Sequence, residues 1–213
     1  MTNFIPIFPL SIIVFPGETL NLHIFEPRYK QLIQECVDQK KPFGIPAVVN
    51  KELKDLGTLI EITAIKQVYE DGKMDISTRG IKVFRLLEVV KEVPDKLYSG
   101  AIVNYPEDED DGNRLLMQKV VAGIKELHKL LEVSKDFKKP EEELKAFDVA
   151  HHMGLNVEEE YELLGLFKEA QRQEYLKRHL GKVIPMLAEM ESLKDKVKLN
   201  GHFRNLESFN FDI

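Results

Sequence analysis

The chain has 213 residues, of which 43% are hydrophobic and 31% are charged, and its formal net charge is −6. This length supplies enough apolar material for one large unit or for two smaller lobes. The acidic balance weighs against nucleic-acid binding, because phosphate neutralisation needs a concentrated positive surface. No apolar run approaches the ~20 residues that span a bilayer, and a single cysteine excludes an intrachain disulfide.

The apolar N-terminal stretch, residues 4–15, does not predict a signal peptide. No basic residue precedes it, and Pro6 and Pro9 interrupt it. With no membrane span and no paired cysteines, the sequence favours a cytoplasmic protein.

Two short strands joined by a tight turn are expected first. Residues 12–15 are apolar and β-branched, and Pro16-Gly17 suits the centre of a type II turn, because Pro fixes φ and Gly accepts a positive φ. Residues 20–25 predict a second strand, after which Pro27 can open a helix. The apolar face of that helix should be formed by Tyr29, Leu32, Ile33, Cys36 and Val37. Cys36 is therefore expected to be a buried thiol.

The next part of the chain predicts further strands. The apolar or alternating segments are 43–49, 57–68, 74–78, 83–90 and 101–105. Pro46 should place the first of these at an edge or a bulge, Asp71-Gly72 predicts a hairpin turn, and Gly80 permits a bend. Six or more short strands separated by turns predict a partly closed barrel or two packed sheets.

Five consecutive acidic residues, 107–111, separate this pattern from a helical one. Their mutual repulsion favours a solvated linker, and the run lacks the alternating ligand spacing of a calcium loop. The predicted division is a β-rich lobe at 1–106, the linker at 107–112, a helical lobe at 113–200 and a tail at 201–213.

The helical lobe shows period-3.6 spacing and recognisable helix ends. The helices are expected at 116–131, from Pro140 to Gly154, after Asn156, and at about 171–197. Asn156 and Glu159 form a capping-box pattern, whereas Pro185 should kink or break the last helix. The tail carries Phe203, Phe209 and Phe211, which either dock on the body or await a partner.

A search for catalytic or cofactor motifs assigns no catalytic, metal-binding or cofactor-binding residue. The chain contains no phosphate-binding loop, no dinucleotide fingerprint and no nucleophile elbow. His151 and His152 are adjacent, about 100° apart on a helix, so they cannot chelate one ion as an i, i+4 pair could. A small hydrolase with catalytic residues scattered in sequence stays an alternative.

Several motifs together resemble the Lon N-terminal, or substrate-binding, domain. They are FPL at 8–10, VFPGE at 14–18, LHIFEPRY at 22–29, Phe43-Gly44, Gly57-Thr58, Asp71-Gly72 and Arg79-Gly80. They occur in family order over roughly the first half of the chain, and residues 148–172 look like the family's helical part. The resemblance implies an α+β fold, with a PUA-like pseudo-barrel lobe followed by a helical bundle.

The resemblance also implies a function. In Lon proteases, which are serine–lysine peptidases, this domain precedes an ATPase module and a protease module, helps to recognise unfolded or tagged substrates, and supports assembly. This sequence has no Walker motif and no room for a protease domain. We therefore expect a stand-alone, non-catalytic module of cytoplasmic protein quality control that binds unfolded or extended polypeptide segments, without a cofactor or a membrane.

The place of binding is left open between a strand edge and a groove between the lobes. The candidate binding residues are His23, Phe25, Glu26, Arg28, Tyr69 and Arg79. The alternative for His23 and Arg28 is a structural role at the strand-to-helix corner. A separate ATPase or protease and a second copy of the chain are further candidate partners. An RNA-binding PUA-like module is the rival function, and it would need a basic surface such as Lys66, Lys73, Arg79, Lys82 and Arg85.

Overall fold

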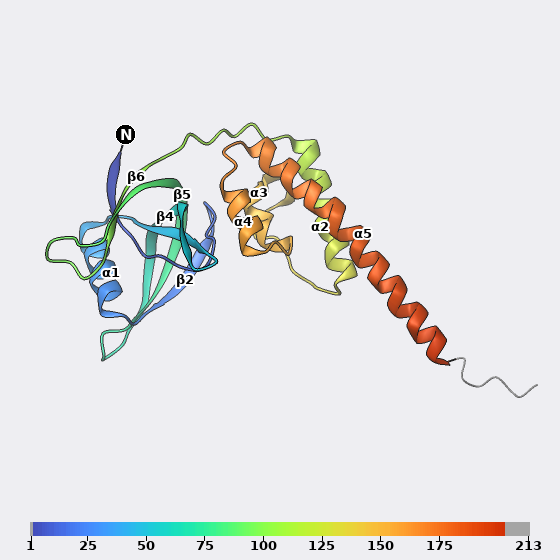
Figure 1. The fold of residues 1–213 in the computed structure, drawn as a ribbon, viewed down its shortest axis with the longest axis horizontal. Helices are drawn as coiled ribbons and strands as arrows, with labels where there is room; N and C mark the ends of the chain where they lie inside the picture. Colours follow the sequence, from blue (N-terminus) through green and yellow to red (C-terminus); the bar gives the residue numbers. More distant parts are fainter. Residues whose placement is uncertain (1, 203–213) are drawn as a thin grey trace, which may run out of the picture.

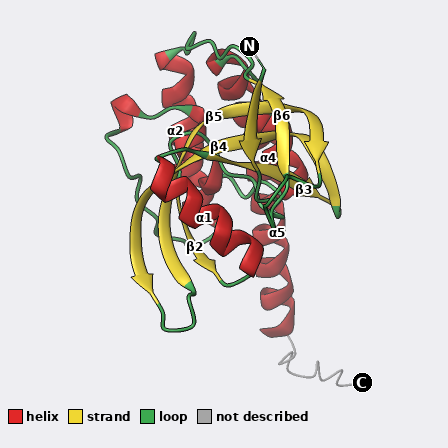
Figure 2. Cartoon of the chain, turned by 90° about the vertical axis from the view of Figure 1, so that its left-hand side faces the viewer, coloured by secondary structure: helices red, strands yellow, loops and turns green. Residues whose placement is uncertain are grey.

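The first half of the chain forms a six-stranded antiparallel sheet with one helix lying across it (Figure 1, Figure 2). The computed structural model describes residues 2–202, with side chains to residue 197. The elements are β1 (Asn3–Pro6), β2 (Thr19–Ile24), α1 (Pro27–Gln39), β3 (Phe43–Val49), β4 (Glu52–Val68), β5 (Met74–Val90) and β6 (Gly100–Asn104). The strand order is β1-β6-β5-β4-β3, and β2 pairs with the first half of β5.

The sheet closes on itself through the segment that follows β1. Ile7 and Leu10 form parallel bridges with Gly44 and Ala47 of β3. β3 at one end of the strand order thereby contacts the segment that follows β1 at the other end. This contact confirms the partly closed barrel. β1 itself was not predicted from the sequence.

The turn at Pro16-Gly17 is confirmed, but the strand predicted before it is wrong. Gly17 has φ 85°, and the Glu18 N–H donates to the Phe15 carbonyl at 3.1 Å, as a type II turn requires. Residues 12–15 form a loop without a strand ladder, in which residues 13–15 are buried. Gly80 lies against this loop so closely that a Cβ there would be 2.3 Å from the Phe15 carbonyl oxygen. Glycine at position 80 is therefore needed for the close approach of the loop to β5.

Several other local predictions for the β lobe are confirmed. The Gly72 N–H donates to the Tyr69 carbonyl at 2.9 Å in the predicted hairpin turn, and β3 has an irregular register after Pro46. α1 buries the predicted face, including Cys36. β5 is one continuous strand rather than two, because its register shift near Gly80 is absorbed without breaking the pairing with β4.

The second half of the chain is helical. Its elements are α2 (Arg114–Leu130), the 3₁₀ turn η1 (Glu141–Glu143), α3 (Ala146–Val149), the 3₁₀ turn η2 (Ala150–His152), α4 (Val157–Leu164) and α5 (Glu169–His202). The capping box is confirmed: the Asn156 side chain accepts from the Glu159 N–H, and the Glu159 carboxylate accepts from the Asn156 N–H, both at 2.9 Å.

One helix prediction is wrong, and a second is wrong in part. The expected helix from Pro140 to Gly154 is three short pieces, because Lys145 is extended and its N–H donates to Asp148 at 3.0 Å, which starts a new helix there. α5 continues through Pro185, so the predicted break does not occur, whereas a kink at Pro185 stays a prediction. Because proline has no N–H, the carbonyl of Gly181, four residues earlier, lacks its usual helical donor.

The two lobes share one hydrophobic cluster. Phe15 and Leu56 from the β lobe pack with Leu163 and Ala150 from the helical lobe, and the rings of Phe15 and Phe147 are stacked 5.1 Å apart. The α+β fold class is thus confirmed, whereas the boundaries drawn at 106 and 113 stay a prediction. Phe203, Phe209 and Phe211 of the tail lie outside the described residues.

No helix within residues 2–202 is both long and apolar enough to cross a membrane.

Candidate functional site

Three of the six predicted binding residues come together at the end of β2. His23 lies opposite Asp75 of β5, with its Nδ1 atom 2.6 Å from the Asp75 Oδ1 atom. The Tyr69 hydroxyl donates to the other oxygen of Asp75 at 2.7 Å. The His23 ring lies 5.9 Å from the Tyr69 ring and 6.1 Å from the Phe25 ring. These four residues are called the aromatic cluster below.

The aromatic cluster is suited to binding rather than to proton transfer. Hydrogen bonds from Tyr69 and then from His23 hold the pKa of Asp75 below its usual value, so the carboxylate stays charged. The hydrogen bond that Tyr69 donates to Asp75 raises the pKa of Tyr69, so the Tyr69 hydroxyl stays protonated. Phe25 is 58% exposed and presents an apolar ring beside these satisfied polar groups. Whether the cluster contacts a ligand stays a prediction.

Asp75 was not identified from the sequence. The only signal was the alternation along β5, where Met74 and Ile76 face the core and Asp75 faces the other way. Its partnership with His23 depends on the pairing of β2 with β5, which brings together residues 52 positions apart.

The other three candidates lie apart from this contact. Arg28 donates to Glu26 at 2.8 Å and stacks its guanidinium 4.5 Å from the Tyr29 ring centre, which matches the structural alternative for this corner. Arg79 lies opposite Thr19, four residues along β5 from Asp75. At ~3.3 Å per residue that is roughly 13 Å away from the aromatic cluster.

The outer edge of β4 is open from residue 61 to residue 68. Pairing with β3 ends at Ile60, whereas pairing with β5 continues to Val68, and within residues 2–202 no further strand pairs with this stretch. Edge strands present a row of unpaired N–H and C=O groups. Ile65 and Val68 on this edge are 40% and 62% exposed.

A hollow of about 440 Å³ borders the open edge beneath the C-terminal end of α1. Its lining is Cys36, Val37, Lys40, Lys41, Pro42, Glu61, Ile62, Thr63, Ala64, Ile65 and Ile81. Burial raises the pKa of Cys36 to about 12, so this thiol stays protonated and does not act as a nucleophile at neutral pH. The apolar part of the lining, which includes Val37, Ile62 and Ile65, lies beside the unpaired backbone groups of the open edge.

A second hollow, of about 380 Å³, lies between α2 and the acidic segment. Four charged groups on its rim are paired with each other, in the contacts of Lys125 with Glu141 and of Lys145 with Asp110, both at 2.6 Å. It has no strand edge, so it is a weaker candidate for binding an extended chain.

Polar side chains of the β lobe and of the helical lobe contact each other directly where the two lobes meet. His151 lies 3.0 Å from both Glu18 in the β lobe and Glu160 on α4, and the Tyr161 hydroxyl donates to Asp55 at 2.5 Å. These contacts favour the strand edge over an interlobe groove as the place of binding.

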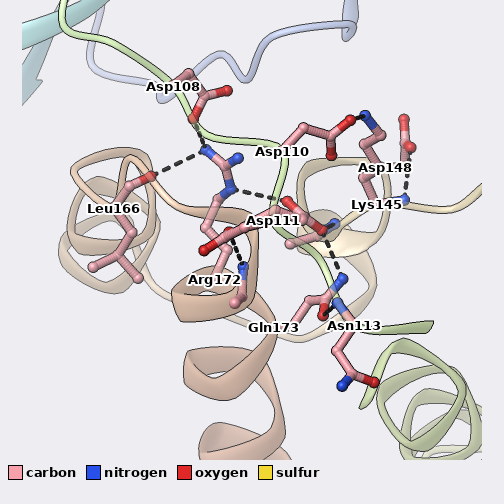
Figure 3. A network of polar contacts seen from close by, with 12 residues as sticks. Asp108, Asp110, Asp111, Asn113, Lys145, Asp148, Leu166, Arg172 and Gln173 are labelled. Atoms are coloured by element: carbon pink, nitrogen blue, oxygen red, sulfur yellow. Dashed lines mark hydrogen bonds and ion pairs between the residues drawn. The ribbon is translucent and has the colours of Figure 1, made fainter. Parts of the chain in front are cut away.

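The acidic segment 107–111 is held against the helical lobe by cations (Figure 3). Asp108 accepts from Arg172 at 2.7 Å, and Asp110 accepts from Lys145 at 2.6 Å. Glu109 accepts from Lys168 at 2.7 Å. Mutual repulsion, on which the linker prediction rested, is thus offset by ion pairs. No group of three metal-ligating side chains is found within residues 2–197.

Four of the five cations that an RNA-binding surface would need are engaged individually. Lys73 pairs with Asp71 at 2.6 Å, Arg85 approaches Asp55 at 3.7 Å, and Lys66 donates to Asn21 at 2.8 Å. Lys82 lies 3.8 Å from the centre of the Tyr105 ring. These contacts do not support a concentrated positive surface.

Comparison with known proteins gives consistent results. Residues 5–182 match the model of the family described as the ATP-dependent protease La (LON) substrate-binding domain. A Lon protease from Parabacteroides distasonis is 32% identical over 133 residues, which are 58% of this chain and 16% of that protein. The chain therefore spans about a sixth of the length of that curated relative.

Two solved structures share the fold. The Lon N-terminal domain protein from Xanthomonas campestris has a TM-score of 0.62 at 23% identity, covering 82% of this chain and 96% of that one. The N-terminal domain of the Mycobacterium avium complex Lon protease has a TM-score of 0.60 at 13% identity, covering 85% of this chain and 100% of that one.

Proposed function

The chain belongs to the family of the ATP-dependent protease La (Lon) substrate-binding domain, and from this membership we propose that it binds extended polypeptide segments along the open edge of β4. The family's substrate-binding domain is non-catalytic. The further proposal is that this chain has no catalytic activity of its own, acts in cytoplasmic protein quality control, and passes bound segments to a separate ATPase or protease.

The open edge at residues 61–68 is the observation that supports this proposal most directly. An added strand would pair with the free N–H and C=O groups of β4, and such pairing depends little on the side chains of the added segment. This is the property that a receptor for many unfolded chains requires. A folded protein has its own backbone groups paired, so it would not compete for the same edge.

The surroundings of the edge supply the apolar part of the binding energy. Every second side chain of an added strand would point toward the hollow beside Ile65 and Ile62. Burial there contributes ~25 cal/mol per Å² before the cost of ordering the bound segment is subtracted. Val68 ends this edge and Tyr69 of the aromatic cluster follows it directly, so a segment longer than the hollow would also approach Tyr69.

Fluorescence anisotropy tests the proposal with one labelled protein, presented first folded and then permanently unfolded. We expect saturable binding of the unfolded form alone. Equal binding of both forms, or binding of neither, would contradict capture of extended segments.

A further inference from the structure

The C-terminal half of α5 leaves the body of the molecule (Figure 1, Figure 2). Up to Leu187, side chains of α5 pack against the shared hydrophobic cluster. Beyond that residue the helix continues to His202, and every side chain from 188 to 197 is solvent-exposed. A solvated helix of this kind would ordinarily carry polar side chains all round.

The projecting half of α5 instead carries an apolar stripe. Its members are Met186, Met190, Leu193 and Val197, which are 54%, 54%, 63% and 65% exposed. They follow one another at intervals of four, three and four residues, which is the a/d spacing of a two-stranded coiled coil. Single exposed apolar residues are ordinary, but four on one seam indicate a surface that another helix covers.

The stripe does not point at the body of its own chain. At 100° per residue, the core-facing residues Leu176, Leu180 and Leu187 define one direction around α5. With the same rotation of 100° per residue, the four residues of the stripe point roughly a quarter turn away from that direction. A second helix can therefore lie along the stripe without displacing the helices already packed on α5.

The charges beside the stripe indicate what the second helix is. With Met190 and Val197 at a positions, Glu189 occupies a g position and Lys194 the following e position. In a parallel pair, a g residue meets the e residue of the next heptad on the partner helix. Glu189 of one copy would thus meet Lys194 of the other, and the same contact would occur twice about the two-fold axis.

From this self-complementarity we propose that two copies of the chain associate in parallel through residues 186–197 of α5. The helix is held in shape by its packed N-terminal half, so association does not bear the cost of nucleating it. The seam covers only about two heptads, so the dimer is expected to form in a concentration-dependent way.

Sedimentation velocity across a concentration series tests the association with the full chain. The wild type should shift from the monomer mass of 24.6 kDa toward twice that value. Leu193→Glu, on the stripe, should keep the chain monomeric, and Ser192→Glu, which adds the same charge one residue away, should not. A wild-type chain that stays monomeric throughout, or equal loss of association in both variants, overturns the proposal.

Charge exchange tests the parallel register. Glu189→Lys and Lys194→Glu should each weaken the dimer several-fold, because each places like charges together at both g–e contacts. The double exchange should restore wild-type association, since it rebuilds both contacts with reversed sign. Failure of the double variant to recover, with helix content unchanged by circular dichroism, would overturn the register. No polypeptide client is present in these measurements, so their outcome is independent of the proposed client binding.

Discussion

His151 and Glu18 connect the two lobes, with the Nε2 atom of the imidazole 3.0 Å from the Oε1 atom of the carboxylate. Glu18 follows the type II turn of the β lobe, and the other ring nitrogen of His151 lies 3.0 Å from Glu160 on α4. A histidine between two carboxylates is favoured in its charged form. One side chain from the segment 150–152 is thus held simultaneously by the loop before β2 and by a helix.

This contact predicts a pH dependence of the free energy of unfolding. Hydrogen bonds to Glu160 and Glu18 raise the pKa of His151 from 6.5 to about 9. Because the folded-state pKa is raised, the stabilisation is fully present below about 6.5 and is lost as the pH rises through about 9. Thermal melts of wild type and His151→Gln should therefore differ most at pH 6 and converge toward pH 10. A difference that does not change with pH would contradict the charged contact.

Gly80→Ala should destabilise the protein by about 2–4 kcal/mol, because the new Cβ would lie 2.3 Å from the Phe15 carbonyl oxygen, which must shift. Gly181→Ala is the matched control, since no atom lies within 4 Å of its Cβ and alanine favours a helix by about 1 kcal/mol. Urea unfolding of both variants measures the two changes. Similar effects at the two positions would contradict the close approach of the loop to β5.

Gly17→Val tests the turn itself. The φ of 85° at this position strains a β-branched residue, and no neighbouring atom lies within 4 Å of a Cβ there, so only backbone strain is added. We expect a lowered melting temperature for Gly17→Val and a smaller decrease for Gly17→Asn, because asparagine tolerates positive φ better. An unchanged melting temperature for Gly17→Val would remove the turn assignment.

Arg172→Met should destabilise the helical lobe by about 3–5 kcal/mol, because it leaves the carboxylate of Glu169 buried without its cation. Arg172 and Glu169 side chains are 4% and 2% exposed, with 3.0 Å between Nε and Oε2. Lys168→Met removes the exposed pair with Glu109 and should change stability little. Chemical unfolding compares the two variants, and equal effects would mean that burial of the pair is not what matters.

Ile65→Lys should weaken binding of an unfolded client roughly tenfold, which corresponds to ~1.4 kcal/mol. The lysine would place a charge at the open edge of β4, where the proposal needs apolar contact. Ile12→Lys is a closely matched control, because Ile12 is also 40% exposed but lies in the loop before the Pro16-Gly17 turn, outside β4. Anisotropy titrations of both variants compare the two positions; equal weakening by both would place the site away from β4.

Features defined within four or five residues were predictable from the sequence. The turn at Pro16-Gly17, the hairpin at Asp71-Gly72 and the cap at Asn156 depend on local backbone geometry, and all three are confirmed. The strand predicted at 12–15 is wrong because strand formation also depends on residues far away in the sequence. β-branched residues favour an extended chain, but a strand also needs a partner, and β5 meets this loop only through isolated contacts such as the Gly17 N–H with the Gly80 carbonyl.

The candidate site required pairings that no local pattern contains. His23 meets Asp75 across 52 residues, and Asp108 meets Arg172 across 64. The open edge of β4 likewise follows from where pairing with β3 ends, at Ile60. The sequence predicted that a strand lies there, but an unpaired edge is a property of the whole sheet.

Amide hydrogen exchange with and without an unfolded client tests the central claim most directly. Strand addition predicts that amides within residues 61–68 become protected when the client binds, because their outward N–H groups gain partners. Protection confined to other parts of the chain, with exchange of residues 61–68 unchanged, would contradict binding at the open edge of β4.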